Sequence, residues 1–195
     1  QMLSEGRAAE ARALVSGLLE RFPGSADLRL IAGDVELLSA NGAGALAHYR
    51  EAARVRSDWP LVRRMVAALN AQGTPAEARA LLARHLAQNT RQEAAAAMLG
   101  RMQRDLGNPA RATALLRHAA SLGAGSRDPL LLVDLAEMEA VLGNTDRALA
   151  AASAAHDRHR GNRRVAQVLG RLRGMEGDEA AAHVLLAKAA GSGIA

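Results

Sequence analysis

The chain has 195 residues, of which 46 are Ala and 29 are Leu, and it contains three aromatic residues and no Cys. Strands need β-branched and aromatic side chains and Ala and Leu are strong helix formers, so this composition excludes a sheet-dominated protein and predicts an all-α fold. It also excludes disulfides and thiolate catalysis, and the sequence has no apolar run of about 18 residues that could span a membrane. The net charge of +5 is too small to indicate a nucleic-acid-binding protein by itself.

One pattern recurs along the chain at intervals of 33 to 36 residues. A Gly is followed five residues later by an Ala, and seven residues after that by another residue that is usually Ala. A repeat of this length is typical of helical arrays, in which each unit buries its apolar face against its neighbours. The first Ala of the pattern falls at Ala11, Ala45, Ala78, Ala112, Ala148 and Ala182, and the residue five before each is Gly6, Ala40, Gly73, Gly107, Gly143 and Gly177.

The pattern places the predicted elements in chain order. Thr74 and Pro75 supply an N-cap and a first-turn Pro where the second helix of one pair should begin, and Asp128 and Pro129 do so for the first helix of a later pair. The segment 123–127 is rich in Gly and Ser and predicts a loop. The resulting layout is a lone helix at 4–21 and five helix pairs at 26–58, 59–91, 93–126, 129–161 and 163–190.

This pattern resembles the tetratricopeptide repeat (TPR) family over almost the whole chain. The unit at 93–126 carries it most fully, in Leu99-Gly100, Leu106-Gly107-Asn108, Ala112, Leu116 and Ala119. The resemblance implies a single array over residues 1–195, in which antiparallel helices A and B stack into a right-handed α-α superhelix of about five and a half repeats. It also implies a small-residue site in helix A that lets helices approach closely, and the residues at this site are Gly33, Val66, Gly100, Ala136 and Gly170.

In the TPR family the A helices line a concave groove that binds the partner. One exposed stripe of each A helix recurs at i, i+4 and i+7, and here it reads Leu30, Asp34, Leu37; Arg63, Ala67, Asn70; Ala97, Arg101, Arg104; Val133, Glu137, Ala140; Gln167, Arg171, Gly174. The polar and charged members of this stripe are the candidate groove residues, namely Asp34, Arg63, Asn70, Arg101, Arg104, Glu137, Gln167 and Arg171.

Three of these groove residues, Arg63, Arg101 and Arg104, predict a basic centre. Arg binds carboxylates through a planar fork, so an extended peptide with acidic residues would suit it. The alternative is that the groove residues are ordinary solvated side chains, partly paired with Asp105 or Glu137. Leu30 and Asp34 replace the Lys and Asn of clamp-type TPR cochaperones, so the resemblance does not extend to that group.

No set of residues indicates catalysis or cofactor binding. His156 and His159 lie on one face of a predicted helix, but a catalytic zinc site usually has three protein ligands. The segment Gly42-Ala43-Gly44 lacks the Lys-Ser/Thr of a phosphate-binding loop. We therefore expect no catalytic residue, no metal, no cofactor and no enzymatic activity.

The resemblance implies a scaffold that binds a protein or peptide partner. A narrower alternative is a periplasmic TPR component of an exopolysaccharide or surface-protein export system, which a signal peptide or lipoprotein Cys in flanking sequence would favour. An RNA-binding helical repeat is the alternative of another class, but three aromatic residues are too few for a base-stacking platform, so no nucleic-acid partner is expected. The preference for Arg over Lys indicates a bacterial protein, and the sequence does not distinguish the cytoplasm from the periplasm.

Both ends of the predicted layout carry apolar side chains without a covering helix. Such stripes mark interfaces or missing structure. We therefore expect one end to pack against another copy of the chain, by a two-fold contact between equivalent ends, or against the next repeat of a longer chain. The residues concerned are Val15, Leu18 and Leu19 at one end and Val184, Leu185, Leu186 and Ala189 at the other.

Overall fold

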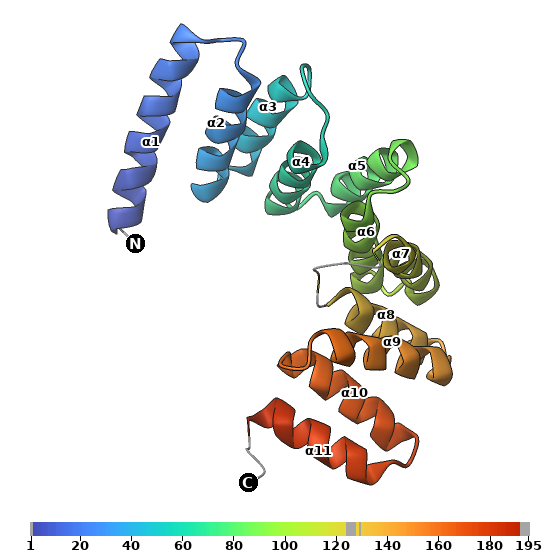
Figure 1. The fold of residues 1–195 in the computed structure, drawn as a ribbon. Helices are drawn as coiled ribbons and strands as arrows, with labels where there is room; N and C mark the ends of the chain where they lie inside the picture. The colour runs from blue at the N-terminus through green and yellow to red at the C-terminus, as the bar shows by residue number, and fades with distance from the viewer. Residues whose placement is uncertain (1, 124–127, 129, 192–195) are drawn as a thin grey trace. The chain divides into compact units, whose positions relative to one another are not determined.

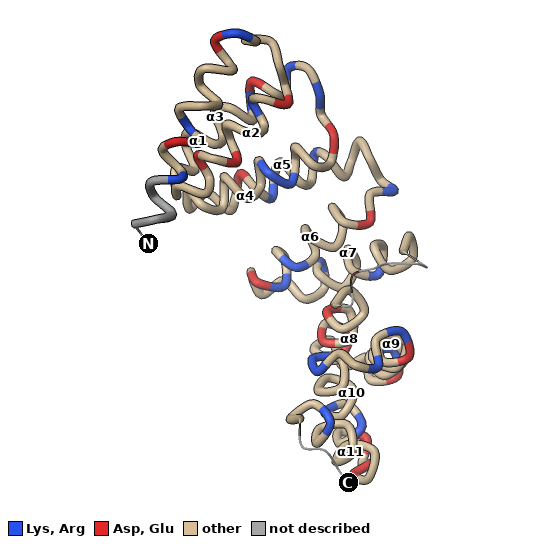
Figure 2. The backbone as a smooth tube through the Cα atoms, turned by 60° about the vertical axis from the view of Figure 1, so that its left-hand side comes forward, with Lys and Arg blue, Asp and Glu red and all other residues tan. Residues whose placement is uncertain are grey.

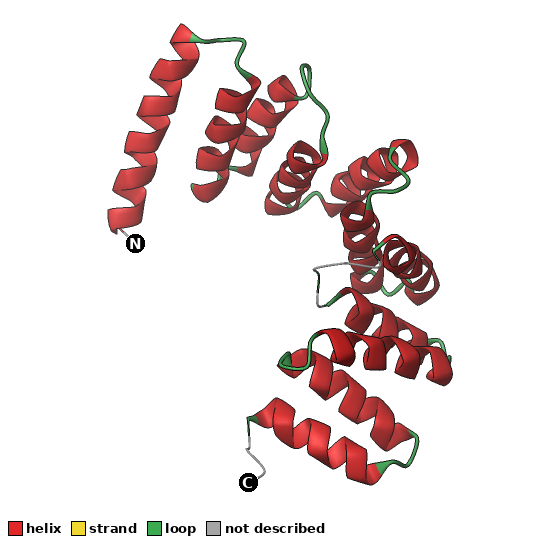
Figure 3. Ribbon diagram, viewed as in Figure 1, coloured by secondary structure: helices red, strands yellow, loops and turns green. Residues whose placement is uncertain are grey.

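A computed structural model describes residues 2–123, 128 and 130–191 of the chain. Within these residues the secondary structure consists of eleven α-helices joined by turns and loops, without any strand (Figures 1 and 3). The all-α class predicted from the Ala and Leu content is confirmed.

The first compact unit ends at Gln88. Within this unit α2 packs against α3 and α4 against α5, and these are its two helix pairs. α1 packs on α2, and α3 packs on α4, so each helix contacts the one that follows it. The bounds are α1 (Met2–Arg21), α2 (Ala26–Leu38), α3 (Gly42–Ala52), α4 (Trp59–Ala71) and α5 (Pro75–Gln88).

The second compact unit begins at Asn89. Its three pairs are α6 with α7, α8 with α9, and α10 with α11, and further contacts join α7 to α8 and α9 to α10. The bounds are α6 (Glu93–Asp105), α7 (Pro109–Leu122), α8 (Leu131–Val141), α9 (Thr145–Arg158), α10 (Arg163–Met175) and α11 (Glu179–Ala190).

The first helix of each pair corresponds to helix A of the predicted repeat, and the second to helix B. The A helices are thus α2, α4, α6, α8 and α10, and within a unit successive A helices also touch one another, α2 with α4, α6 with α8 and α8 with α10. α1 carries the sequence pattern of a B helix, with Ala11 in the register of Ala45.

The turn from helix A to helix B has the same geometry in all five pairs. One residue adopts the left-handed backbone conformation, and the N–H of the next residue donates to the carbonyl five residues earlier, as Asn108 does to Gln103 (2.9 Å) and Asn144 to Glu139 (2.9 Å). This bond closes the end of helix A. Gly is the residue that adopts this conformation without steric cost. The φ angles are 57° at Ala40, 72° at Gly73, 73° at Gly107, 77° at Gly143 and 88° at Gly177.

Small residues let the helices of several pairs approach closely. A Cβ on Gly100 of α6 would lie 2.9 Å from Cγ of Leu116 in α7, and one on Gly170 of α10 would lie 3.0 Å from Cγ of Leu186 in α11. On the B helices, Ala45 and Ala112 have no exposed surface. The small residues of helix A, such as Gly100 and Gly170, and the recurring helix-B Ala are therefore residues at which the two helices of a pair meet.

The predicted layout can be compared with the helix bounds. The helix pairs begin at Ala26, Trp59, Glu93, Leu131 and Arg163, where the sequence predicted starts near residues 26, 59, 93, 129 and 163. Pro129 and residues 124–127 of the predicted loop lie outside the described residues. The residues form two compact units, and the single continuous array over both of them stays a prediction.

Candidate protein-interaction surface

In the first unit the candidate groove residues lie on α2 and α4. Asp34 of α2 accepts a hydrogen bond from the hydroxyl of Tyr49 (2.7 Å) and from Nε of Arg64 (2.9 Å). Burial and the bond to Asp34 raise the pKa of Tyr49 above its ordinary value, so the phenol stays protonated. Asp34 therefore joins α2 to α3 and to the next A helix, α4.

Arg63 and Asn70 of α4 are exposed. Among the described residues, Arg63 forms no ion pair with an acidic side chain, in contrast to Arg64 beside it. Arg63 is thus a candidate groove residue of the first unit whose guanidinium is available to a partner.

In the second unit Arg101 and Arg104 of α6 converge on one buried carboxylate. Arg101 Nε donates to Asp134 Oδ2 at 2.5 Å, and Arg104 Nη1 donates to Asp134 Oδ1 at 2.6 Å. The side chain of Asp134 is 8% exposed, whereas Arg101 is also bonded to Asp128 (2.6 Å) and Arg104 to Asp105. Burial opposes the charge of Arg101, but the bonds to Asp134 and Asp128 outweigh it and raise the pKa of Arg101.

Glu137 of α8 forms the matching link to α10. It accepts from Arg164 at 2.8 Å and from Arg171 at 3.3 Å. These two pairs place one acidic residue of α8 beside two basic residues of α10, and Figure 2 shows both helices coloured by charge. Gln167 and Arg171 are exposed on the same helix. Ion pairs between A helices within each unit therefore use many of the charges that the sequence assigned to a partner.

A second set of polar contacts lies at the ends of two A helices. Glu36 of α2 accepts from Arg12 of α1 (2.6 Å) and from the side chain of Asn41 (2.6 Å). The bond from Arg12 holds the pKa of Glu36 below its ordinary value despite burial, which acts in the opposite direction. This contact ties α1 to α2 and α2 to the start of α3.

The same arrangement recurs in the second unit. Glu139 of α8 accepts from Arg117 of α7 (2.5 Å) and from the side chain of Asn144 (2.8 Å). Burial would raise the pKa of Glu139, but the bonds from Arg117 and Asn144 outweigh it and lower the pKa. The sequence carries a signal for this motif, which is a Glu or Gln five residues before the N-cap Asn of helix B.

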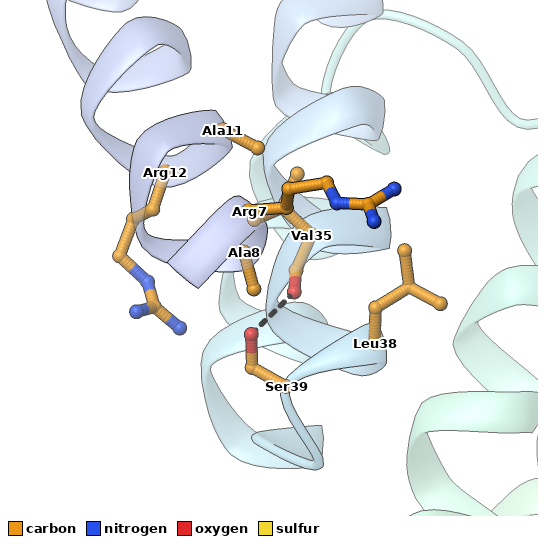
Figure 4. Close-up of a pocket in the computed structure, with 7 residues that line it drawn as sticks. All are labelled: Arg7, Ala8, Ala11, Arg12, Val35, Leu38 and Ser39. Carbon is orange, nitrogen blue, oxygen red and sulfur yellow. Dashed lines mark hydrogen bonds between the residues drawn. The ribbon is translucent and has the colours of Figure 1, made fainter. Parts of the chain in front are cut away.

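A pocket of about 680 Å³ opens between α1 and α2 (Figure 4). Side chains from both helices line it, and the close-up shows Arg7 extending over the side on which Val35 and Leu38 lie. Its lining is mainly apolar with two Arg side chains, and consists of Arg7, Ala8, Ala11, Arg12, Val35, Leu38 and Ser39.

Comparison with solved structures identifies the fold. A structure of the C-terminal part of a TPR repeat-containing protein from Cytophaga hutchinsonii is similar at a TM-score of 0.76 and 12% identity, over 98% of this chain and 76% of that one. This chain has the TPR fold. A scan with protein-family models finds no match, and a sequence search of curated proteins finds none either.

Two further TPR-fold matches cover most of both chains. PilF of Pseudomonas aeruginosa is similar at a TM-score of 0.74 and 20% identity, over 94% of this chain and 83% of that one. YrrB, described as a TPR protein with an unusual peptide-binding site, is similar at a TM-score of 0.69 and 18% identity, over 91% of each chain. At these identities the similarity establishes the fold alone. It does not assign the partners of those proteins to this chain.

Three members of the predicted TPR groove stripe are buried. Leu30, Ala97 and Val133 are 8%, 3% and 1% exposed and belong to the core. The prediction that they face a groove was wrong, because a stripe defined on one helix does not account for the neighbouring helices that cover part of it.

Two residues of the predicted basic centre are paired with an acidic side chain. Arg101 and Arg104 share Asp134, a residue outside the predicted groove stripe. Arg63 belongs to the first unit and Arg101 and Arg104 to the second, so a common centre stays a prediction. A charged residue within the apolar run of 131–136 could have indicated Asp134 as a buried partner, because a buried charge needs a partner of opposite sign.

The described residues hold no group of three His, Cys, Asp or Glu side chains placed to share a metal ion. His156 lies on α9, and His159 is at its C-cap. None of the described helices combines the length and the apolarity needed to cross a bilayer.

Proposed function

We propose that the chain is a non-catalytic scaffold that binds a protein or peptide partner along the A helices of a unit. The observation that supports this most directly is the set of exposed polar side chains on these helices, with Arg63 and Asn70 on α4 in the first unit and Gln167 and Arg171 on α10 in the second. A rigid helical framework with exposed, adaptable polar side chains is suited to recognising an extended segment.

A partner segment with acidic residues fits the first unit best. Arg63 is exposed, and no acidic side chain of the described residues neutralises it. Arg101 and Arg104 are less suitable contacts, because a partner would have to compete with the buried carboxylate of Asp134. Recognition of acidic peptides is thus assigned to Arg63 first and to Arg171 second, since Arg171 is 55% exposed and its bond to Glu137 is long.

The test measures binding of a fluorescein-labelled, Glu-rich peptide by fluorescence anisotropy. Arg63→Glu should weaken binding, and binding should fall as salt rises because exposed charges are screened. Arg84→Glu is the matched control, since Arg84 is an exposed Arg on a B helix of the same unit. Equal losses for Arg63→Glu and Arg84→Glu would contradict the assignment to the A-helix face. A single-stranded RNA bound more tightly than the peptide would favour the nucleic-acid alternative.

We further propose that the C-terminal helix is a self-association surface. Val184 and Leu186 of α11 are 55% and 38% exposed, and a two-fold contact between two such helices would cover both copies with the same residues. Light scattering over a concentration series should then show a dimer that Leu186→Glu dissociates. A chain that stays monomeric at every concentration would contradict this.

A further inference from the structure

Among the described residues, α1 has no A helix of its own packed against it, whereas every other B helix has one. Ala45, Ala112 and Ala148 lie five residues after the left-handed turn residue, and they have no exposed surface because each of these B helices packs on its own A helix. Ala11 holds that position in α1 and is partly exposed. Leu14 is 67% exposed, whereas Leu185, its equivalent in α11, lies against Gly170 of α10.

The facing surface of α2 is uncovered in the same way. Val35 is partly exposed. In α4, α8 and α10, which each follow another helix pair or helix A within the same unit, the equivalent residue is buried. These residues are Ala68, Met138 and Leu172. Ile31 of α2 is 47% exposed, whereas its equivalent Val168 in α10 is 2% exposed. The exposed faces of α1 and α2 therefore correspond to the two surfaces against which an A helix packs elsewhere in this chain, namely its own B helix and the next A helix.

The pocket between α1 and α2 is lined by residues of these two exposed faces. It has a volume of about 680 Å³, with Ala8, Ala11, Val35 and Leu38 as its apolar lining (Figure 4). A groove of this kind between helices suits the apolar face of another helix.

The charge at one end of the pocket specifies the helix further. Arg7 stands four residues before Ala11, which is the register of Asn41, Asn108 and Asn144 in the other B helices. Those three side chains donate to Glu36, Gln103 and Glu139. Each acceptor lies three residues after the small residue of its A helix, namely Gly33, Gly100 or Ala136. An exposed Arg at this position selects a carboxylate acceptor, because the pair is then charge-assisted.

We propose that the pocket between α1 and α2 binds an amphipathic helix of a partner protein in which a small residue is followed three positions later by Glu. The small residue faces Leu14, which is 67% exposed, and the Glu pairs with Arg7. The residue after the small one is apolar, because it meets Ile31 where other A helices meet a charged neighbour such as Arg64 or Asp134. This site is separate from the acidic-peptide surface and does not rest on it.

The probe is a capped synthetic peptide with the sequence of residues 26–38 in which Asp34 is replaced by Leu, so that it carries Gly33, an apolar residue 34 and Glu36. Fluorescence anisotropy with the full chain should show saturable binding. Arg7→Glu in the chain should weaken it on the order of tenfold, the loss expected for one charge-assisted bond. Glu36→Arg in the peptide should restore affinity for the Arg7→Glu chain but not for the unchanged one, and Arg84→Glu should leave the affinity unchanged.

Leu14→Glu supplies a second, apolar test, and circular dichroism checks that each variant keeps its helices. Absence of saturable binding, or binding that Arg7→Glu and Leu14→Glu leave unchanged, would overturn the proposal. Sedimentation velocity of the chain alone identifies the competing occupant. A self-associated species that Leu14→Glu dissociates would show that a second copy covers this face, and would also overturn it.

Discussion

The ring of Tyr49 lies against Gly33, so that a Cβ on residue 33 would come within 2.6 Å of Cδ1 of that ring. Tyr49 has no exposed surface, and its hydroxyl donates to Asp34, the residue next to Gly33 (2.7 Å). The close approach of α2 and α3 therefore depends on the absence of a side chain at residue 33, and the Tyr49–Asp34 bond fixes the ring in that position.

Gly33→Ala should destabilise the chain by roughly 1–3 kcal/mol, the cost of overpacking a filled core. Gly17→Ala is the matched control, because nothing lies within 4 Å of a Cβ at residue 17 in α1 and Ala is about 1 kcal/mol better than Gly inside a helix. Urea unfolding followed by circular dichroism measures both. If the two variants shift the midpoint in the same direction, the contact between residue 33 and Tyr49 is not as described.

Ala40 adopts a conformation that Ala disfavours. Its φ is 57°, in the position where the other four described turns have Gly. A left-handed conformation costs an L-residue with a Cβ roughly 1–2 kcal/mol, and Gly at this position would remove that cost. Part of this gain in stability is offset, because Gly is more flexible in the unfolded chain. Ala40→Gly should therefore raise the free energy of unfolding by about 0.5–1 kcal/mol.

The reverse substitution, Gly107→Ala, is the natural comparison. It introduces the same Cβ at φ 73° and should lower stability by a similar amount. Both variants can be measured in one set of thermal melts. A destabilising Ala40→Gly would mean that the Ala side chain contributes contacts that outweigh its backbone strain.

Much of the fold could be predicted from the sequence, because the residues that bring helices together are chemically distinctive. The turn Gly and the helix-B Ala recur at fixed separations, and such a pattern has few explanations other than a helical repeat. Gly107 and Ala112 illustrate this, the first by its positive φ and the second by its complete burial.

The candidate site was less predictable, because it depends on contacts between helices distant in sequence. Helical periodicity places Arg101 and Arg104 on one face of α6, but it does not tell which residue of α8 lies opposite. Asp134 reaches both of them because α6 and α8 are adjacent A helices. The same limit explains the error at Ala97, whose exposure depends on the neighbouring helices and not on its own helix.

Ala112→Leu should cost roughly 1–3 kcal/mol through overpacking, since Ala112 is fully buried at the contact with Gly100 of α6. Ala97→Leu should cost a comparable amount, because Ala97, which the sequence placed on the exposed stripe, is only 3% exposed. Ala114 is exposed on the same helix as Ala112, so Ala114→Leu should change the melting temperature little. Equal melting temperatures for Ala112→Leu and Ala114→Leu would refute the assigned helix-B face.

Glu139 should make the stability of the second unit depend on pH. Its folded-state pKa is lowered below the ordinary value of 4.5, because bonds from Arg117 and Asn144 outweigh the effect of burial. A carboxyl with a lowered folded-state pKa contributes stability that is present above its unfolded-state pKa and is lost as pH falls through the folded-state pKa. Glu139→Gln should therefore lower stability by roughly 1–2 kcal/mol at pH 7, and this difference should shrink as pH falls below 4.5.

Thermal melts of the unchanged chain and of Glu139→Gln between neutral and acidic pH give the difference directly. Glu10→Gln is the control, because Glu10 is exposed on α1 and, among the described residues, forms no ion pair. Its effect should be small throughout, since single exposed charges contribute little. If Glu139→Gln lowers the melting temperature equally at pH 7 and in acid, the side chain acts through its shape and hydrogen bonds, and the charge on Glu139 is not what joins Arg117 to α8.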